Sequence, residues 1–225
     1  YDLAKQVWRS REILVPFIKD LSAHKNKPFT FDSSVIADQQ RNDLQNLCQV
    51  LSKKGCLTFK KCKNNFEIIP TLSRANKRFL HGLWAEEITL YLIDKTLKTF
   101  TAKRPLKHKL FWNVKLKRNG SAKDNDMELD LVAQVADRFY IFETKSGEVV
   151  SIDKWVDRAH LFDDKKNRFI TCTADENLNP RIFHPFRLFA LPTLETQFTQ
   201  ILEKDFTENP ALPISATVPT PEKKV

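Results

Sequence analysis

Apolar residues recur at helical spacing through the first quarter of the chain. Residues 2–24 carry such a stripe, which predicts a helix that Pro16 kinks or divides. A second helix is predicted over residues 38–54, where Gly55 follows as a natural C-cap. The stripe of this second helix is formed by Leu44, Leu47, Cys48 and Leu51.

The period then changes from helical to strand-like. The runs CLTFKKC and FEIIP are joined by KNN, a turn with asparagines where a positive φ is tolerated, and they predict a hairpin. Helices followed by a basic hairpin are typical of a winged helix, with Lys60, Lys61 and Lys63 near the hairpin tip. The alternative is a small domain over residues 1–75 that only packs against its neighbour.

A second pattern begins at Asn76 and predicts a mixed α/β domain over residues 76–206. Proline-rich residues 207–225 are expected to form a flexible tail. The pattern predicts helices over residues 76–97, 152–162 and 194–206, and strands over residues 108–118, 128–136, 138–145 and 168–174.

Two of these strands alternate between apolar and polar residues. The first is expected to place Leu110, Trp112, Val114 and Leu116 on one face and Lys109, Asn113, Lys115 and Lys117 on the other. The second is expected to place Leu129, Leu131, Ala133 and Val135 on one face and Glu128 and Asp130 on the other. Both strands are therefore predicted to be half-buried.

The composition fits a globular protein with a polyanionic partner. Among 225 residues, 41% are hydrophobic and 29% charged, which excludes disordered, collagen-like and coiled-coil classes. The 37 Lys and Arg outnumber the 28 Asp and Glu, which favours nucleic acid as this partner, with an acidic membrane surface as the alternative. The charged residues near the start and the lack of a long apolar run lead us to expect no membrane span and no signal peptide, and hence a cytoplasmic protein. Its four cysteines lack zinc-site spacing and are expected to be reduced.

A candidate catalytic centre lies at the end of the strand RFYIFETK. Glu143 and Lys145 share one strand face with Phe139 and Ile141, and a hairpin through residues 137–138 brings Asp130 close to Glu143. Two converging carboxylates are costly to bury unless a divalent cation such as Mg²⁺ or Mn²⁺ is their partner. The lysine alongside can then orient a water or stabilise charge on phosphate. The alternative is an ordinary ion pair between Glu143 and Lys145.

An acid on the preceding helix strengthens the catalytic interpretation. Leu80, Trp84, Ile88 and Tyr91 mark the predicted buried stripe, and Glu87 falls close to its centre. An acid inside an apolar stripe is costly to bury unless its carboxylate faces a metal ion or a paired cation. Glu86 lies off this stripe and is the residue expected to be solvated, although the helical wheel leaves it as a second candidate.

These residues resemble a known superfamily of nucleases. Asp130 followed by Glu143-Thr144-Lys145 resembles the signature of PD-(D/E)xK restriction-endonuclease-like proteins. More narrowly, the runs HGLWAEE, MELD and FETKSG are similar to the nuclease half of CRISPR-associated nucleases activated by cyclic oligoadenylate. The resemblance covers roughly residues 30–190. It implies a restriction-endonuclease-like core behind a winged-helix-like segment.

The resemblance also implies roles for individual residues. Asp130 and Glu143 would be metal ligands together with the Thr144 carbonyl, Lys145 the catalytic lysine, and Glu86 or Glu87 the helix-borne acid. Such nucleases carry an upstream CARF sensor and act as homodimers, so this chain is expected to be an excised effector half or a stand-alone relative. Two departures are Thr144, where cysteine is usual, and the run FDDKKNRF, which lacks the paired glycines of these nucleases.

A basic segment accompanies the acidic site. Residues 101–123 contain eight Lys or Arg and no acid, with Phe111 and Trp112 among them. We expect Lys109, Lys115, Lys117 and Arg118 to contact phosphates together with Lys60 and Lys61, and Trp112 to be a core residue. The predicted function is metal-dependent hydrolysis of DNA or RNA. The alternatives are a restriction or repair endonuclease unrelated to CRISPR and a non-catalytic winged-helix protein that binds nucleic acid.

Overall fold

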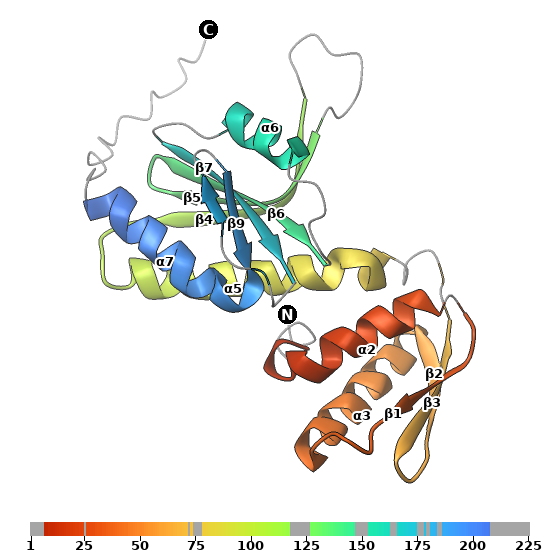
Figure 1. Ribbon diagram of the computed structural model, residues 1–225. Helices are drawn as coiled ribbons and strands as arrows, with labels where there is room; N and C mark the ends of the chain where they lie inside the picture. Colours follow the sequence, from red (N-terminus) through yellow and green to blue (C-terminus); the bar gives the residue numbers. More distant parts are fainter. Residues whose placement is uncertain are drawn as a thin grey trace, which may run out of the picture.

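The structure is a computed structural model in which two parts are distinguishable along the chain (Figure 1). A small N-terminal part of helices and a three-stranded sheet adjoins a larger part built on a six-stranded sheet. The described residues are 7–24, 26–71, 73, 78–117, 127–146, 153–162, 166–174, 178, 181–183 and 186–207. Arg118 and the predicted tail at residues 208–225 lie outside them.

The N-terminal part packs two helices against one sheet. Its strands are antiparallel in the order β1-β3-β2. Its elements are α2 (Arg11–Ala23), β1 (Phe29–Asp32), α3 (Asp38–Lys53), β2 (Leu57–Lys61) and β3 (Asn65–Pro70). The predicted stripe of α3 is buried, and Gly55 follows the helix at φ +69°, as its C-cap role requires. The hairpin β2–β3 is confirmed, whereas β1 was not predicted from the sequence.

Pro16 does not divide the first helical run. It lies inside α2, and the break in the run falls at Ser10, whose φ and ψ are −118° and 35°. Val7, Leu14, Phe17 and Ile18 of this region are fully buried in a core that continues into the larger part.

The larger part is a mixed sheet in the order β4-β5-β6-β7-β9-β8. The pairs β4–β5, β5–β6 and β8–β9 are antiparallel, whereas β6–β7 and β7–β9 are parallel. The mixed α/β fold class is thereby confirmed, although β8 and β9 were not predicted. The elements are the π-helical segment η1 (Phe79–Leu83), α5 (Trp84–Thr101), β4 (His108–Leu116), β5 (Met127–Val135), β6 (Arg138–Lys145), α6 (Asp153–Phe162), β7 (Asn167–Thr173), β8 (Arg181–Phe183), β9 (Phe186–Ala190) and α7 (Leu191–Thr207).

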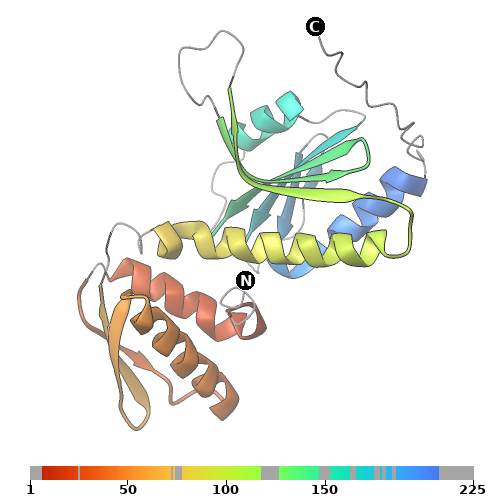
Figure 2. The same cartoon turned by 180° about the vertical axis from the view of Figure 1, so that it is seen from behind.

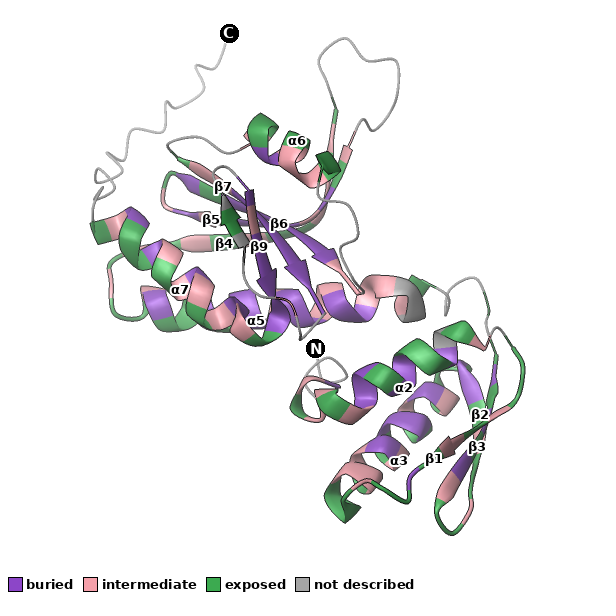
Figure 3. Cartoon of the chain, viewed as in Figure 1, coloured by how far each residue is buried: buried purple, intermediate pink, exposed green. Residues whose placement is uncertain are grey.

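Helices cover both faces of this sheet. Helices α5 and α7 lie along one face and the shorter α6 lies on the other, as the two opposite views show (Figures 1 and 2). The central strands are accordingly buried along most of their length (Figure 3). Two apolar clusters follow from this layering. The larger lies under α5 and α7 and contains Tyr140 and Phe142, and the smaller lies under α6 and contains Ile141 and Phe169.

A buried ionic network fastens α7 to the sheet. Asp205 on α7 is 4% exposed, accepts a hydrogen bond from the Tyr140 hydroxyl at 3.2 Å and pairs with Arg168 at 2.6 Å. Breaking a buried pair leaves an uncompensated charge. We expect Asp205→Ala to lower the free energy of unfolding, measured in urea, by about 3 kcal/mol.

The matched control is Lys95→Ala, which breaks the exposed Lys95–Glu195 pair between α5 and α7. Exposed pairs contribute about 0 to 1 kcal/mol, so this variant should unfold almost as the parent does. Equal losses in the two variants would contradict the anchoring role of Asp205.

Candidate functional site

The candidate centre is built at the carboxyl end of β6. Phe139 and Ile141 face the α6 side of the sheet, and Glu143 and Lys145 continue that face with contacts to α6. The shared face predicted from the sequence is therefore confirmed. Thr144 points to the opposite side, where its hydroxyl donates to that of Thr89 on α5 at 3.1 Å. Helices on both faces thus fix the end of this strand.

Asp130 is brought to the same place by the hairpin between β5 and β6. The turn is formed by Ala136, at φ +52°, and Asp137, one residue earlier than the sequence indicated. The pairing places Leu131 opposite Phe142, so one further step aligns Asp130 with Glu143. The backbone N–H of Thr144 donates to Asp130 Oδ2 at 2.7 Å. The predicted convergence of the two acidic residues is consistent with this geometry.

The predicted alternation of β4 and β5 fails at the level of Asp130. Leu129 packs under α6, whereas Leu131 packs under α5 and α7. On β4, Leu110 and Val114 likewise belong to opposite faces, and Asn113 between them has φ +52°. A residue in this conformation re-aims the strand, so the face changes beside Asp130. An alternation rule cannot anticipate such a local change.

The structure also changes which helical acid faces the centre. The pKa of Glu86 is raised, first by burial and then by the charge of Asp130, while the Trp112 side chain donates to its carboxylate and lowers the pKa. The sequence favoured Glu87 because Leu80 was used to define the buried stripe. The residues around it form a π-helical turn with Gly82 at φ +157°, so a single helical wheel does not extend across it.

Trp112 was wrongly expected in the core. Its side chain is 41% exposed, and its bond to Glu86 places it at the edge of the centre. The indole N–H thus supplies a donor to an acid that burial would otherwise penalise.

Burial and mutual repulsion govern the two strand carboxylates. Glu143 is 2% exposed, and its pKa is raised to about 7, first by burial and then by the charge of Asp130. The pKa of Asp130 is raised by burial, against the opposing effects of the Thr144 N–H, Lys145 and Arg158. The centre therefore holds two acids whose ionised forms are disfavoured mainly by burial.

Helix α6 supplies two residues that the sequence analysis missed. Arg158 forms an ion pair with Glu143, and Lys145 Nζ lies 3.7 Å from the same carboxylate. Trp155 underlies both cations, with its ring centroid 5.0 Å from the Arg158 guanidinium and 4.4 Å from Lys145 Nζ. The i, i+3 spacing of Trp155 and Arg158 was visible in the sequence, but the face on which they lie was not.

The donor set suits a hard cation that keeps part of its water shell. Within the described ranges, no group of three His, Cys, Asp or Glu side chains is placed to hold a metal ion. Magnesium is commonly held by one or two carboxylates plus substrate phosphate, so Asp130, Glu143 and the Thr144 carbonyl fit that chemistry. Arg158 is the competing partner of Glu143.

The basic residues do not form one continuous face. Val114 and Leu116 face α6, so strand alternation puts Lys115 and Lys117 on the opposite side from Lys109, which shares the face of Phe111. All three lysines are exposed, and Lys115 pairs in register with Glu128 beside Asp130.

In the N-terminal hairpin, Lys61 donates to Gln45 of α3 at 2.7 Å. Lys60 is exposed and lies opposite Glu67 in the sheet. Lys60 and Lys61 therefore each have a polar neighbour within the protein, which competes with a phosphate for the lysine ammonium group.

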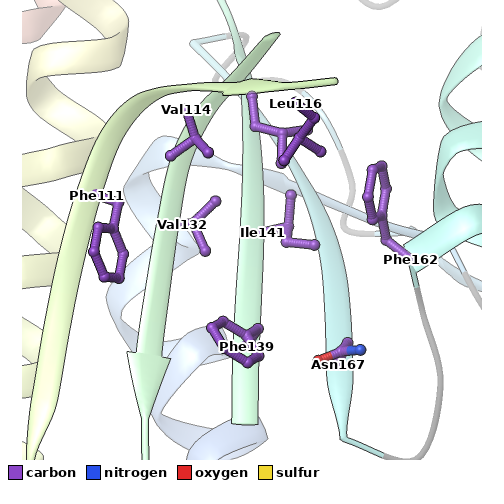
Figure 4. Close-up of a pocket in the computed structure, with 9 residues that line it drawn as sticks. Phe111, Val114, Leu116, Val132, Phe139, Ile141, Phe162 and Asn167 are labelled. Atoms are coloured by element: carbon purple, nitrogen blue, oxygen red, sulfur yellow. The ribbon is translucent and has the colours of Figure 1, made fainter. Parts of the chain in front are cut away.

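An apolar pocket of about 380 Å³ lies over the sheet (Figure 4). Its lining residue Ile141 is two residues from Glu143 on β6, so the pocket is on the same face of the sheet as Glu143. Phe111, Phe139 and Phe162 line it, and Asn167 is the one polar side chain among its lining residues. None of these lining residues is ionisable, so the pocket is not the chemical centre.

Comparison with known proteins shows similarity of fold. No protein-family model matches the sequence, and no curated protein matches it. The protein VC1899 from Vibrio cholerae is similar over 90% of this chain and 57% of its own, with a TM-score of 0.53 and 17% identity. Can2 from Sulfobacillus thermosulfidooxidans, solved with cyclic tetra-adenylate, matches 88% of this chain and 53% of its own, with a TM-score of 0.46 and 15% identity. The chain thus spans just over half the length of these proteins. No helix among the described residues is long and apolar enough to cross a bilayer.

Proposed function

We propose that this chain is a divalent-metal-dependent nuclease that hydrolyses phosphodiester bonds in DNA or RNA. The observation that carries the proposal is the meeting of two acids at a buried strand end: the Thr144 N–H donates to Asp130, the charge of Asp130 raises the pKa of Glu143, and Lys145 lies beside them. A buried pair of acids whose pKa values are both raised is a typical arrangement of a functional site. The similarity of fold to VC1899 is compatible with this proposal and does not test it.

In the proposed mechanism, each residue has a distinct task. Asp130 and Glu143 hold the cation, which when bound would act as a Lewis acid on the phosphate. The Thr144 N–H fixes the Asp130 carboxylate, so one oxygen is oriented in advance. Lys145 is 36% exposed, and its ammonium therefore reaches solvent, where it can orient a water or stabilise charge on a phosphate oxygen. Glu86 adds a further acid from α5 that can accept a proton or hold a water.

The Arg158–Glu143 pair favours a second candidate, a protein that binds nucleic acid without cutting it. In this alternative, Arg158 neutralises Glu143 permanently and no cation enters. The two functions differ in one measurable property, which is cleavage that depends on a divalent cation.

We further propose an effector role linked to CRISPR defence and cyclic oligoadenylate, with activation through an upstream sensor and a homodimer. This part rests on the motif resemblance of Asp130 and Glu143-Thr144-Lys145. A restriction or repair endonuclease remains the alternative, because the same centre would serve either role.

The first functional prediction concerns the chemistry. Asp130→Asn, Glu143→Ala and Lys145→Ala should each lower the rate of cleavage in Mn²⁺ at least about a hundredfold, because each removes a metal ligand or a charge stabiliser. The rate is measured on labelled single- and double-stranded DNA and RNA, with and without chelator.

A matched pair on α5 refines this test. Glu86→Gln should slow cleavage, whereas Glu87→Gln should leave it near the parent rate, because Glu86 is the acid coupled to Asp130. Comparable activity in Glu143→Ala and the parent would refute the nuclease assignment. Loss of cleavage in Glu87→Gln but not in Glu86→Gln would mean that Glu87 is the helix-borne acid of the centre.

A second prediction concerns binding by β4. Replacing Lys115 and Lys117 together by Ala should weaken nucleic-acid binding regardless of base sequence. It should also reduce the slope of log K against log salt by about two, because each lysine would neutralise one phosphate. Lys109→Ala is the matched control, because Lys109 pairs with Gln134 at the end of β4 away from Asp130, and it should change the slope less. An unaltered slope in the double variant would mean that both lysines are merely solvated.

A third prediction concerns activation. If a sensor gates the nuclease, the present chain should cleave weakly, and cyclic oligoadenylate should neither bind nor stimulate it. Fusion to a natural upstream sequence should restore ligand-dependent cleavage. Turnover by this chain equal to that of the activated longer protein would rule out gating, and monomeric sedimentation of an active chain would rule out the dimer.

A further inference from the structure

The acidic centre already contains an internal cation. Arg158 reaches from α6 to the Glu143 carboxylate, whose side chain is only 3% exposed. A divalent ion that uses Glu143 as a ligand would occupy space next to this guanidinium. Two positive groups on one carboxylate repel each other, so binding of a divalent cation and the Arg158–Glu143 ion pair oppose each other.

Trp155 gives Arg158 a second source of support. The indole ring lies 5.0 Å from the guanidinium, 4.4 Å from Lys145 Nζ and 5.3 Å from Lys154 Nζ. The face of a tryptophan stabilises a cation with no carboxylate present. Arg158 can therefore leave Glu143 while its guanidinium stays on the aromatic ring.

Arg158 is also partly open to solvent. Its side chain is 18% exposed, and Lys145 beside the same ring is 36% exposed. A planar guanidinium matches the oxygens of a phosphate diester as well as it matches a carboxylate. The two partners of Arg158, one internal and one external, are chemically alike.

We propose that Arg158 is a positioning residue that couples cation binding to nucleic-acid binding. In the free protein it neutralises Glu143. When a nucleic-acid phosphate arrives, Arg158 pairs with that phosphate, and Glu143 becomes available to the divalent cation. The coupling is reciprocal, so each ligand strengthens the binding of the other. This inference rests on the proposed nuclease function, and it explains how one glutamate serves both an arginine and a metal ion.

The test measures binding rather than turnover. Mn²⁺ affinity is determined on the whole chain without nucleic acid, by electron paramagnetic resonance at pH 8.5, where protons compete little for the carboxylates. Oligonucleotide affinity is determined in chelator and again in Ca²⁺, a hard cation with the same preference for oxygen, with gels to check that no cleavage occurs. The ratio of the two affinities gives the coupling factor.

Arg158→Gln should bind Mn²⁺ alone about tenfold more tightly than the parent, a difference of about 1.4 kcal/mol, because the internal competitor is gone. The same variant should bind nucleic acid more weakly in chelator, and its coupling factor should fall towards one. Arg158→Lys keeps the charge and should lie between the parent and Arg158→Gln in each measurement.

Lys154→Gln is the matched control. It removes one positive charge from the same helix and the same tryptophan, but this charge has the smallest of the effects on the pKa of Glu143. Mn²⁺ affinity within about twofold of the parent is expected there, since a charge at an exposed position contributes little. Thermal unfolding of each variant verifies that the chain is folded.

Two outcomes would overturn the inference in distinguishable ways. If Glu143→Gln abolishes Mn²⁺ binding while Arg158→Gln leaves both Mn²⁺ affinity and the coupling factor unchanged, the metal site stands and Arg158 does not couple the ligands. If Glu143→Gln binds Mn²⁺ as the parent does, the proposed metal site fails and the coupling fails with it. Should Arg158→Gln not fold, the same comparison is made with Arg158→Lys.

Discussion

The burial of one charged side chain, Glu143, is the constraint on which the rest of the centre depends. A carboxylate that is 2% exposed requires compensation, and the surrounding elements each supply part of it. Helix α6 contributes Arg158, the strand itself contributes Lys145, and the adjacent Asp130 works against both by adding a second negative charge. Glu86 and Asp130 place two further acids near this pair, and the charge of Asp130 raises the pKa of both Glu86 and Glu143. Acids that repel one another in this way favour a cation between them.

The fold meets this constraint by holding the strand end from both faces. The apolar residues of β6 alternate between the two clusters, so α5 and α6 can each approach the sheet closely. Thr144 is then tied to Thr89 on one side, while Glu143 meets Arg158 on the other. The change of face at Asn113 and Asp130 completes the arrangement, because it separates Leu129 from Leu131 and frees the acid between them to reach the Thr144 N–H. The local distortion of β4 and β5 thus helps to position the carboxylate of Asp130.

The N-terminal part bears on the centre through packing. Its core continues into that of the larger part, and α2 adjoins the π-helical segment that precedes α5. Gly82 in that segment lies close to Ser146, directly after Lys145, where a Cβ atom would meet the Ser146 hydroxyl oxygen at 3.8 Å. The start of α5, which carries Glu86, is therefore held between the N-terminal part and the end of β6.

Local periodicity and turn chemistry were enough to predict α3, α5, the hairpins β2–β3 and β5–β6 and the acidic end of β6, whereas β1, β8 and β9 were not predicted. Glu143 and Lys145 share a face as strand alternation predicts, and the predicted hairpin brings Asp130 to the end of β6, although the turn lies one residue earlier than the sequence indicated. The remaining features depend on tertiary contacts. The choice of Glu86 over Glu87 depends on a π-helical turn, the facing of Lys115 depends on a backbone distortion at Asn113, and the pairing of Arg158 with Glu143 depends on how α6 docks. Each of these arises from contacts between residues distant in the chain, which no local pattern records.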